Sequence, residues 1–499
     1  MEALMWISNS ERPLHTTEIC HALGVKIGSA DLDLENIPTI QTLLACSLGL
    51  ITVEESSSTV RLVHFSLQEY LSYNLSLFQS PHSMIAEVCL TYLNFRRVRE
   101  LSPTLASAPS TVPFAQYASG YWGEHMRRGG AGNMSPFALE LLIEFEQHVS
   151  SQLLLVRYYE EVRWWEPSFD NSDGPRGFTG LHGAAFFGMV ETVATLLARG
   201  WDINATDIRG RTALAWAAAG GHEDVVAMIL QQKGAKADTR DTEYGLTPLW
   251  LAAAYGNEGV VKLLLEREDV NPNTTHTEYG WTPLLLAVEN GCEGMAKLLL
   301  GRGGADPNTV DFRYGRTPLL LAAKGGHEGV AKLLLERGDI NPNAADTEYG
   351  WTPLLWAVDC GYEGIAKLLL ERGDIDPNTA DTENGRTPLL LAAKGGHEGV
   401  VRLLLEQDGV NPDITDLNGE TALQLAASLG HTRVVELLSA SKPSFPVAED
   451  IDAAPNHLSP DPSDLLQSLS QPPRRFRFRR LNPFRRILNP SSQGRSAFS

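Results

Sequence analysis

The sequence predicts a mostly α-helical protein: a small helical unit with two strands, a helical connector, and then a solenoid of stacked repeats. The main observation is a repeated motif, because RTPLLLAAKGGHEGV at Arg316–Val330 returns unchanged at Arg386–Val400. A constant period of this size is typical of stacked-repeat proteins. The second observation is that residues 1–80 lack the motif and combine helical periodicity with two short alternating segments. Aligned on its threonine, the motif occurs eight times at steps of 33 to 35 residues, at Thr179, Thr212, Thr247, Thr282, Thr317, Thr352, Thr387 and Thr421.

The composition is that of a globular protein. Of the 499 residues, 43% are hydrophobic and 20% are charged, and the net charge is −20. This acidity disfavours a broad nucleic-acid-binding surface, because a phosphate backbone would be repelled. Five widely spaced cysteines without a CxxC pair indicate neither a disulfide framework nor a zinc knuckle. With no secretory signal predicted either, we expect a cytoplasmic protein, with a nuclear location as the alternative.

Residues 1–80 are predicted to form a winged-helix domain. EALMWISNSE is the first helix, TTEICHALG the second, capped by Thr16 or Thr17 and ended by Gly24, and IPTIQTLLACSLG the third, opened by Pro38. LITVE and TVRLVHF alternate like two strands around the polar turn ESSS, which gives the wing. The third helix has no Lys or Arg, so we expect no DNA binding through it.

Residues 81–175 are predicted to form a helical connector without chemistry-bearing motifs. Two helices are expected, SMIAEVCLTYLNFRRVREL and SPFALELLIEFEQHVSSQLLLVRYY, with the loop SPTLASAPSTVP between them.

Each repeat is predicted to hold two helices and a long loop. In the copy at Thr317, this residue is the N-cap and Pro318 the first helical residue. LLLAAK forms a short helix ending at Gly325 or Gly326, and EGVAKLLLER forms a second helix ending at Gly338. DINPNAADTEYG then supplies turn residues for an extended finger.

This order of helix, turn, helix and finger, with TPL near its start, resembles the ankyrin repeat. The resemblance covers residues 176–440 and implies an array that binds proteins with its fingers and concave face. Copies run two residues beyond the usual length of about 33. The family's TPLH histidine survives only at His182, so apolar packing is expected to replace its hydrogen bond in the middle repeats. The eight repeats are expected at 176–208, 209–243, 244–278, 279–313, 314–348, 349–383, 384–417 and 418–440.

The N-terminal unit carries a resemblance of its own. RLVHFSLQEYLS, from Arg61 to Ser72, is similar to the winged helix that follows the NACHT nucleotide-binding module in fungal NOD-like receptors, and to the one named after GPI inositol-deacylase. The similarity continues through CLTYLNF, YASGYWGEH and SFDNSDGPRGFTGLHGAAFFG. In that family a histidine matching His64 is implied to sense the nucleotide. Because no P-loop occurs in this sequence, we favour a His64 that packs or hydrogen-bonds locally.

No cofactor, metal ion or catalytic site is expected. GxSxG and P-loop motifs are absent from the sequence. GHEGVA resembles the first half of the metalloprotease HExxH motif, but Val226, Ala331 and Val401 stand where its second histidine should be. The first histidine is itself exchanged for other residues in further copies, as a turn residue would be.

Candidate partner-binding residues are those that differ between copies and are expected to point outward. They precede the threonine, lie at the finger tip or end the first helix. Tyr, Trp and Arg are the types enriched at binding hot spots. Two interpretations stay open, since these rings either bind a partner or pack finger against finger. The candidates are Tyr244, Tyr255, Tyr279, Trp281, Glu289, Arg316, Tyr349, Trp351, Asp359 and Arg386.

Three hypotheses of function follow. The leading one is a non-catalytic interaction protein, monomeric in isolation, whose array recognises a partner protein. An alternative is that the chain is the C-terminal fragment of a NACHT ATPase, which an in-frame GxxxxGK[ST] motif upstream would support. A third is a nuclear or membrane-associated regulator that acts through its basic tail.

The tail at 441–499 is rich in Ser, Pro and Asp and is predicted to be disordered. Its basic segment, interleaved with phenylalanines, is expected to bind anionic membranes or an import receptor; a solvated tail without a partner is the alternative. The arginines of this segment are Arg474, Arg475, Arg477, Arg479, Arg480, Arg485 and Arg486.

Deleting residues 471–499 should reduce flotation of the protein with acidic liposomes. Each arginine near an anionic surface contributes about 1 kcal/mol of binding, and the phenylalanine rings can insert at the interface. Equal flotation of the full and shortened chains on acidic lipid would rule out the membrane half of this prediction.

Overall fold

The computed structural model describes residues 1–74, 77–130, 136–162, 174–302 and 304–441. These residues are mostly helical, with two β-strands among them, which confirms the predicted fold class. The described residues divide into two compact units: Met1–Ala287 with Gly294–Asp306, and Val288–Glu293 with the described residues that follow Asp306. Within the described residues, no helix combines the length and apolarity that a bilayer crossing requires. From residue 442 onward, the predicted tail lies outside the described part.

The N-terminal domain is a winged helix, as the sequence predicts. Strands β1 and β2 pair antiparallel, with Ile51 opposite Leu62, and form the wing. Its buried core contains Trp6 from the first helix, Ile19 from the second helix and Val60 from the wing. The elements are α1 (Glu2–Asn9), α2 (Thr16–Leu23), η1 (Leu34–Asn36), α3 (Ile40–Cys46), β1 (Ile51–Glu54), β2 (Thr59–Leu62) and α4 (Phe65–Tyr73).

The helix starts in this domain differ in detail from the prediction. Helix α2 is capped by His15 rather than by Thr16 or Thr17, because the Glu18 carboxylate accepts a 2.8 Å hydrogen bond from the His15 N–H and completes a capping box. Helix α3 is capped by Thr39, one residue after Pro38.

His64 caps α4. Its Nδ1 accepts a 3.1 Å hydrogen bond from the backbone N–H of Ser66, and the residue is exposed. This is the local bonding that the sequence favours, although the residue lies just beyond the strand.

The connector contains one helix that the sequence did not reveal. Helix α7 carries Gly120 and Gly123, which lower its helix propensity. A Cβ at Gly123 would overlap the buried Phe187 ring, so the glycine allows this close approach. The second predicted helix is broken into three parts. The connector elements are α5 (Pro81–Leu93), α6 (Arg96–Arg99), α7 (Ala115–Arg128), α8 (Pro136–Ile143), η3 (Phe145–Gln147) and α9 (Val149–Val162).

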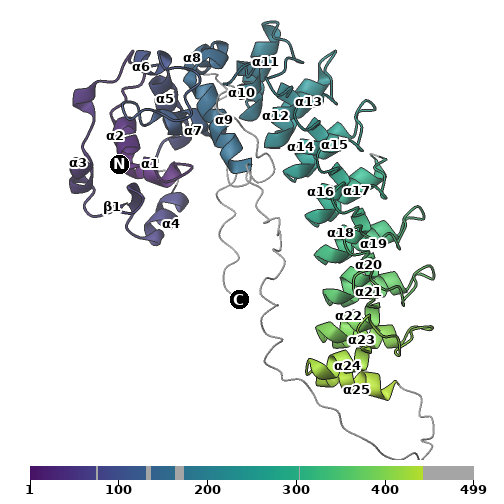
Figure 1. The fold of residues 1–499 in the computed structure, drawn as a ribbon. Coiled ribbons are helices and arrows are strands. Elements are labelled where there is room, and N and C mark those ends of the chain that lie inside the picture. Colours follow the sequence, from purple (N-terminus) through teal and green to yellow (C-terminus); the bar gives the residue numbers. More distant parts are fainter. Residues whose placement is uncertain (75–76, 131–135, 163–173, 303, 442–499) are drawn as a thin grey trace, which may run out of the picture. The chain divides into compact units, whose positions relative to one another are not determined.

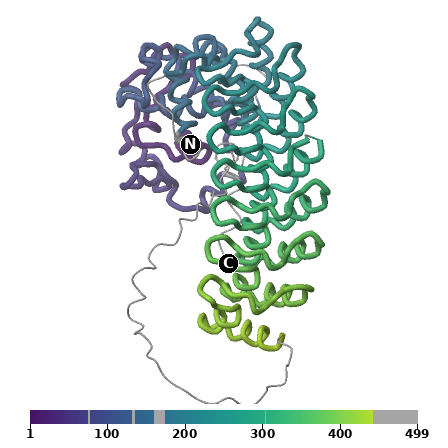
Figure 2. Tube along the Cα trace, turned by 45° about the vertical axis from the view of Figure 1, so that its right-hand side comes forward, coloured from purple at the N-terminus to yellow at the C-terminus, as the bar shows by residue number. Residues whose placement is uncertain are grey.

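The repeats form pairs of antiparallel helices, an inner and an outer one. In the second unit the inner helices α18, α20, α22 and α24 stack on one another, and the outer helices α19, α21, α23 and α25 form a parallel row (Figure 1). The Cα trace follows the same path from repeat to repeat (Figure 2). The inner helices are α10 (Gly180–Phe186), α12 (Ala213–Gly220), α14 (Pro248–Ala254), α16 (Pro283–Glu289), α18 (Pro318–Gly325), α20 (Pro353–Asp359), α22 (Pro388–Gly395) and α24 (Ala422–Ser428). The outer helices are α11 (Val190–Ala198), α13 (Glu223–Gln231), α15 (Glu258–Leu264), α17 (Glu293–Gly301), α19 (Glu328–Leu335), α21 (Glu363–Leu370), α23 (Glu398–Leu405) and α25 (Thr432–Ala440).

The motif caps its helices largely as predicted. Thr317 Oγ1 accepts a 3.3 Å hydrogen bond from the Leu320 N–H, and Gly326 ends α18 in the left-handed conformation with φ 72°. Helix α19 ends at Leu335 with Glu336 as C-cap, so Gly338 lies beyond its end. The fully buried Leu320 occupies the TPLH position, whereas His182 bonds the Ala205 carbonyl at 3.0 Å. Apolar packing therefore does replace that bond, as expected.

A histidine at the start of the outer helix ties each such repeat to the one before it. His222 Nε2 lies 2.8 Å from the Phe186 carbonyl oxygen, and its ring packs on the left-handed Gly188. Asn257 does the same by donating from Nδ2 to the Ala218 carbonyl at 2.9 Å. The other such histidines are His327, His397 and His431, at 3.0 to 3.1 Å from carbonyl oxygens of the preceding repeat. This residue is thus an inter-repeat link rather than a simple turn residue.

An asparagine ladder links the loops in the same way. Asn308 Nδ2 donates to the Asp339 carbonyl at 2.6 Å, and its Oδ1 accepts from the Asn341 N–H at 2.9 Å. Equivalent donors are Asn204, Asn273, Asn343 and Asn378. Each loop is therefore held by the next one along the stack.

Stability should fall in acid because of His222. Burial lowers its pKa to about 4, whereas an unfolded histidine binds a proton near pH 6.5. The contribution is therefore fully present above pH 6.5 and is lost as pH falls towards 4, by at most about 1.4 kcal/mol per pH unit. The variant His222→Asn places at this position the amide donor that Asn257 uses, and asparagine does not titrate. Its free energy of unfolding in urea should therefore change less between pH 7 and pH 5 than that of the wild type. An unchanged pH slope would contradict this.

Candidate functional site

A buried aspartate anchors each of six fingers. In the finger that follows α19, Asp346 Oδ1 accepts hydrogen bonds from the backbone N–H groups of Tyr349 at 2.8 Å and Trp351 at 3.2 Å. These bonds fix the turn, so they fix where the finger-tip residue and the residue before the threonine lie. The equivalent aspartates are Asp207, Asp241, Asp311, Asp381 and Asp416.

The second carboxylate oxygen of this aspartate faces the inner helices. Asp346 Oδ2 accepts from the Trp356 Nε1–H at 3.0 Å, and Asp207 Oδ2 accepts from Trp216 in the same way at 3.0 Å. Asp241 Oδ2 instead pairs with Arg211 at 3.2 Å, and both side chains are fully buried. One residue type therefore holds the finger with one oxygen and an inner-face side chain with the other.

In the second unit, side chains of two neighbouring repeats form one mixed aromatic and charged surface. The Trp351 and Trp356 ring centroids are 4.6 Å apart, and Lys324 Nζ lies 4.6 Å from the Trp356 ring centroid. The Arg316 guanidinium lies 3.9 Å from the Tyr314 ring centroid and pairs with Glu348 at 3.1 Å. All of these rings and cations are half-buried. We call Tyr314, Arg316, Lys324, Trp351 and Trp356 the tryptophan surface.

Four buried polar atoms of the tryptophan surface and its fingers have no hydrogen-bond partner among the described residues, and two of these atoms are Arg316 Nε and Asp311 Oδ2. Trp351 Nε1 is buried without an acceptor, and Asp381 Oδ2, in the next finger, is buried without a donor. Leaving such a group unsatisfied costs about 1–3 kcal/mol each. These atoms are closed off from solvent, so a partner reaches them only after a side-chain movement.

Charged groups near the surface are partly removed from water. Burial lowers the pKa of Lys324, with Arg316 acting in the same direction. Burial also raises the pKa of Glu289 and of Asp359, which end the inner helices α16 and α20. Charged groups with reduced hydration form stronger hydrogen bonds than those in bulk water.

Two sequence candidates do not point outward. Tyr244 is only 7% exposed because its ring stacks on His276, with centroids 4.8 Å apart. Tyr255 is 2% exposed, and its hydroxyl bonds the Tyr158 hydroxyl at 2.8 Å. The residue before the threonine is also buried in three repeats, at Phe178, Arg211 and Leu246.

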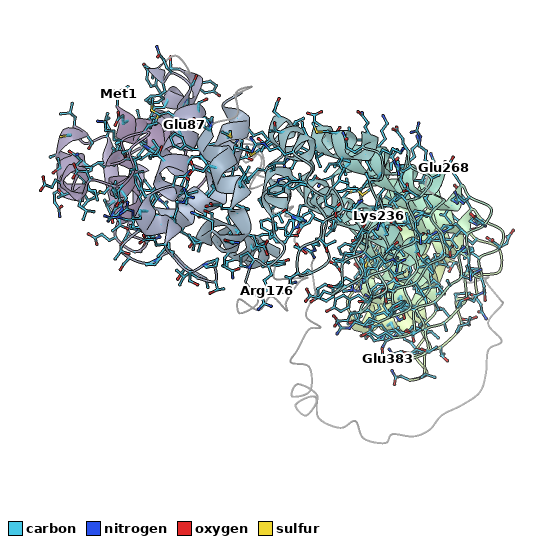
Figure 3. All side chains as sticks on the ribbon, turned by 90° about the horizontal axis from the view of Figure 1, so that it is seen from above. Met1, Glu87, Arg176, Lys236, Glu268 and Glu383 are labelled. Carbon is cyan, nitrogen blue, oxygen red and sulfur yellow. The ribbon has the colours of Figure 1, made fainter. Side chains whose placement is uncertain are left out.

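The other candidates are half-buried. Tyr279 packs on His276 at 4.8 Å, and the Trp281 carbonyl accepts from Trp250 Nε1 at 2.8 Å. Arg386 lies 3.6 Å from Asp416, and Tyr349 packs on Trp351 at 6.2 Å. Glu383, next to the tip of its finger, lies at the edge of its unit away from the helices (Figure 3). The arginines of the tail lie outside the described residues.

Sequence reasoning missed Trp356 and the finger aspartates. A signal for Trp356 exists, since it stands where the two identical copies have Leu321 and Leu391. The aspartates recur in every finger but one, where His276 replaces them and its Nδ1 accepts from the Glu278 N–H at 3.2 Å. Recurrence marks a structural role, and only the structure shows that the second oxygen serves the inner face.

Comparison with known families agrees with this architecture. The family described as "Ankyrin repeats (3 copies)" matches residues 230–311, 304–381 and 374–449, and "Ankyrin repeats (many copies)" matches residues 181–230. The family "GPI inositol-deacylase, winged helix domain" matches residues 1–80. The chain is an ankyrin-repeat protein with an N-terminal winged helix. Such an array is a scaffold for protein–protein interaction.

Individual relatives resemble the chain over part of its length. It is 27% identical to "Azaphilone pigments biosynthesis cluster protein L" of Monascus ruber over 259 residues, which is 45% of this chain and 53% of the relative. It is 42% identical to "Notch-regulated ankyrin repeat-containing protein A" of Danio rerio over 60 residues, 12% of this chain and 54% of the relative. The Xenopus tropicalis "Notch-regulated ankyrin repeat-containing protein" is 37% identical over 70 residues, 14% of this chain and 61% of the relative. The chain thus spans little more than half the length of these relatives.

Arg211→Ala should strongly destabilise the first unit. It would leave the buried Asp241 Oδ2 without its cation, which costs about 3–5 kcal/mol of the free energy of unfolding. Arg302→Ala is the matched control, because its ion pair with Glu266 is exposed on both sides and contributes less than about 1 kcal/mol. Chemical denaturation of both variants checks this; equal losses would show that burial of the Arg211 pair is not what matters.

Proposed function

We propose that the chain is a recognition module that binds a partner protein through its array, with the tryptophan surface at the centre of the interface. The observation that carries this is the packing of Trp351 on Trp356, with Lys324 over the Trp356 ring, on the half-buried tryptophan surface. Two tryptophans, a tyrosine and an arginine also gather there, and these are the residue types that dominate binding hot spots.

The arrangement suits a partner with both apolar and acidic character. The Trp351 and Trp356 rings offer apolar area, while Lys324 and Arg316 supply cations that are partly desolvated. An acidic side chain of the partner could accept from the Trp351 Nε1–H or pair with Lys324. The competing interpretation is that Trp351 only packs one finger on its inner helix, because it also contacts Trp356 and Tyr349.

The test separates binding from packing. The full chain is immobilised, proteins it retains are identified, and the affinity of each is measured for the wild type, Trp351→Ala and Trp351→Phe. If the surface binds, Trp351→Ala should weaken affinity by roughly 2 kcal/mol, about 30-fold, with little change in melting temperature. Trp351→Phe keeps most of the ring and removes Nε1–H, so it reports the polar contact alone.

The control is Lys332→Ala, which removes an exposed side chain from the outer helix α19 of the same unit. It should leave both affinity and melting temperature unchanged. A Trp351→Ala variant that melts early yet binds with full affinity per folded molecule would place recognition elsewhere.

A second candidate concerns the longer protein context. The winged-helix match at residues 1–80 precedes the array, with the helical connector between them, the order that the resemblance to fungal NACHT–ankyrin receptors implies. The array would then be the sensing arm of an ATPase whose nucleotide-binding half lies upstream. Reading the genomic sequence upstream of Met1 tests this: an in-frame GxxxxGK[ST] motif after a predicted strand supports it, and a stop codon without an intron boundary opposes it.

A further inference from the structure

Three side chains of types that commonly bind metal ions lie close together inside the first unit, N-terminal to the repeats. Glu11 follows α1, His82 is the second residue of α5, and His125 lies in the last turn of α7. One potential ligand atom of each lies within 4.8 Å of the other two. Helix α5 packs against both α1 and α7, so the cluster lies where the winged helix meets the connector (Figure 1).

The two imidazoles face each other through their Nδ1 atoms. These atoms are 2.8 Å apart, and the rings stack with centroids separated by 5.1 Å. Such a distance requires one proton between the two nitrogens, so one Nδ1 donates and the other is unprotonated and accepts. The other nitrogen of His125, Nε2, is held by the Tyr117 hydroxyl at 2.9 Å. This orients the fully buried His125 ring with Nδ1 towards the cluster.

The carboxylate of Glu11 is incompletely satisfied. Its side chain is only 1% exposed, and neither oxygen accepts a hydrogen bond, although Arg128 Nη1 lies 3.0 Å from Oε1. Oε1 has this ion pair and Oε2 has no partner among the described residues, and a buried carboxylate oxygen left so is costly unless a cation coordinates it. Arg128 has a second carboxylate within reach, because its Nε donates to Glu124 at 2.8 Å. The guanidinium can therefore keep a partner when Glu11 changes its own.

We propose that Glu11, His82 and His125 bind a zinc ion that fastens the winged helix to the connector. Two imidazole nitrogens and one carboxylate oxygen form a donor set that Zn²⁺ prefers, with a fourth position left for water. Metal–nitrogen bonds of about 2.0–2.1 Å in a tetrahedral site require the two Nδ1 atoms to move apart by roughly 0.5 Å. A small rotation of the half-buried His82 ring supplies this movement. The backbone N–H of Glu11 also donates to the Tyr117 hydroxyl at 3.0 Å, so the outer hydrogen bonds of two ligands converge on one group.

The alternative occupant of the cluster is a proton alone. In that case the imidazole pair shares the proton as a permanent buried hydrogen bond, and Arg128 permanently neutralises Glu11. The two occupants predict different results. A zinc site retains added metal and loses affinity when His82, His125 or Glu11 is replaced, whereas a shared proton leaves the protein without retained zinc in every variant.

The experiment uses the full chain after treatment with a chelator. Zn²⁺ is added, excess ion is removed by gel filtration, and retained zinc is measured; Co²⁺ is used in parallel as a spectroscopic probe. The wild type should retain one zinc ion per chain, melt at a higher temperature with the ion, and show visible d–d bands of four- or five-coordinate Co²⁺. His82→Gln and the near-isosteric Glu11→Gln should each weaken affinity by more than about tenfold, since even the loss of outer-shell partners costs about 10- to 100-fold.

The matched control is His64→Asn, which removes an exposed histidine of the same unit and keeps a side chain suited to capping α4. It should bind zinc as the wild type does. Zinc retention in the wild type that is no higher than in folded His82→Gln or Glu11→Gln would overturn the proposal, as would a loss in His64→Asn of the same size.

Discussion

The buried aspartate of six fingers makes the hydrogen bonds on which the tryptophan surface depends. Asp346 holds its finger turn with Oδ1 and the Trp356 indole with Oδ2. A carboxylate is suited to both tasks because it accepts from several donors at once and its hydrogen bonds are charge-assisted. The direction of the finger and the position of an inner-helix side chain are thereby fixed by a single residue. Where Oδ2 finds no donor, as at Asp381, the same device leaves a buried acceptor beside the surface.

The links between repeats use backbone groups rather than carboxylate oxygens. Histidine rings bond carbonyl oxygens at the end of the preceding inner helix, and asparagine side chains bond the next loop. Both sets use backbone groups that helix ends and turns leave unpaired, so they satisfy the polar atoms that stacking buries. Because backbone partners do not depend on side-chain identity, a duplicated repeat can stack on its neighbour without further adjustment. This is a physical reason why identical copies such as Arg316–Val330 and Arg386–Val400 can stand in one array.

The parts that the sequence predicts are those decided within one repeat or one hairpin. The threonine cap, the glycine that ends the first helix (predicted at Gly325 or Gly326) and the pairing of the wing strands depend on near neighbours, and all were predicted. The errors arise where a distant segment decides. Tyr255 looks like an exposed helix end until the hydroxyl of Tyr158, from the connector, reaches it. Helix α7 was missed because Gly123 reflects close packing with Phe187, and Gly120 close packing with Arg157, rather than a turn. The sequence identified only part of the tryptophan surface for the same reason. Trp351 is found because this position differs between repeats, whereas the role of Trp356 depends on its hydrogen bond to Asp346.

Variation within a nearly constant frame then shows where specificity can reside. In the repeat that begins at Thr352, a tryptophan replaces the arginine before the threonine, and Trp356 replaces a leucine of the inner helix. These two changes are coupled, because the rings pack on each other with centroids 4.6 Å apart. Trp356 also donates to Asp346 Oδ2, and the equivalent oxygen of Asp241 pairs with Arg211 instead. With that oxygen occupied, Arg316 turns to Glu348 and to the Tyr314 ring instead. Two substitutions thus redirect a third side chain and leave an indole N–H unpaired, although the helices and links that carry them are unchanged.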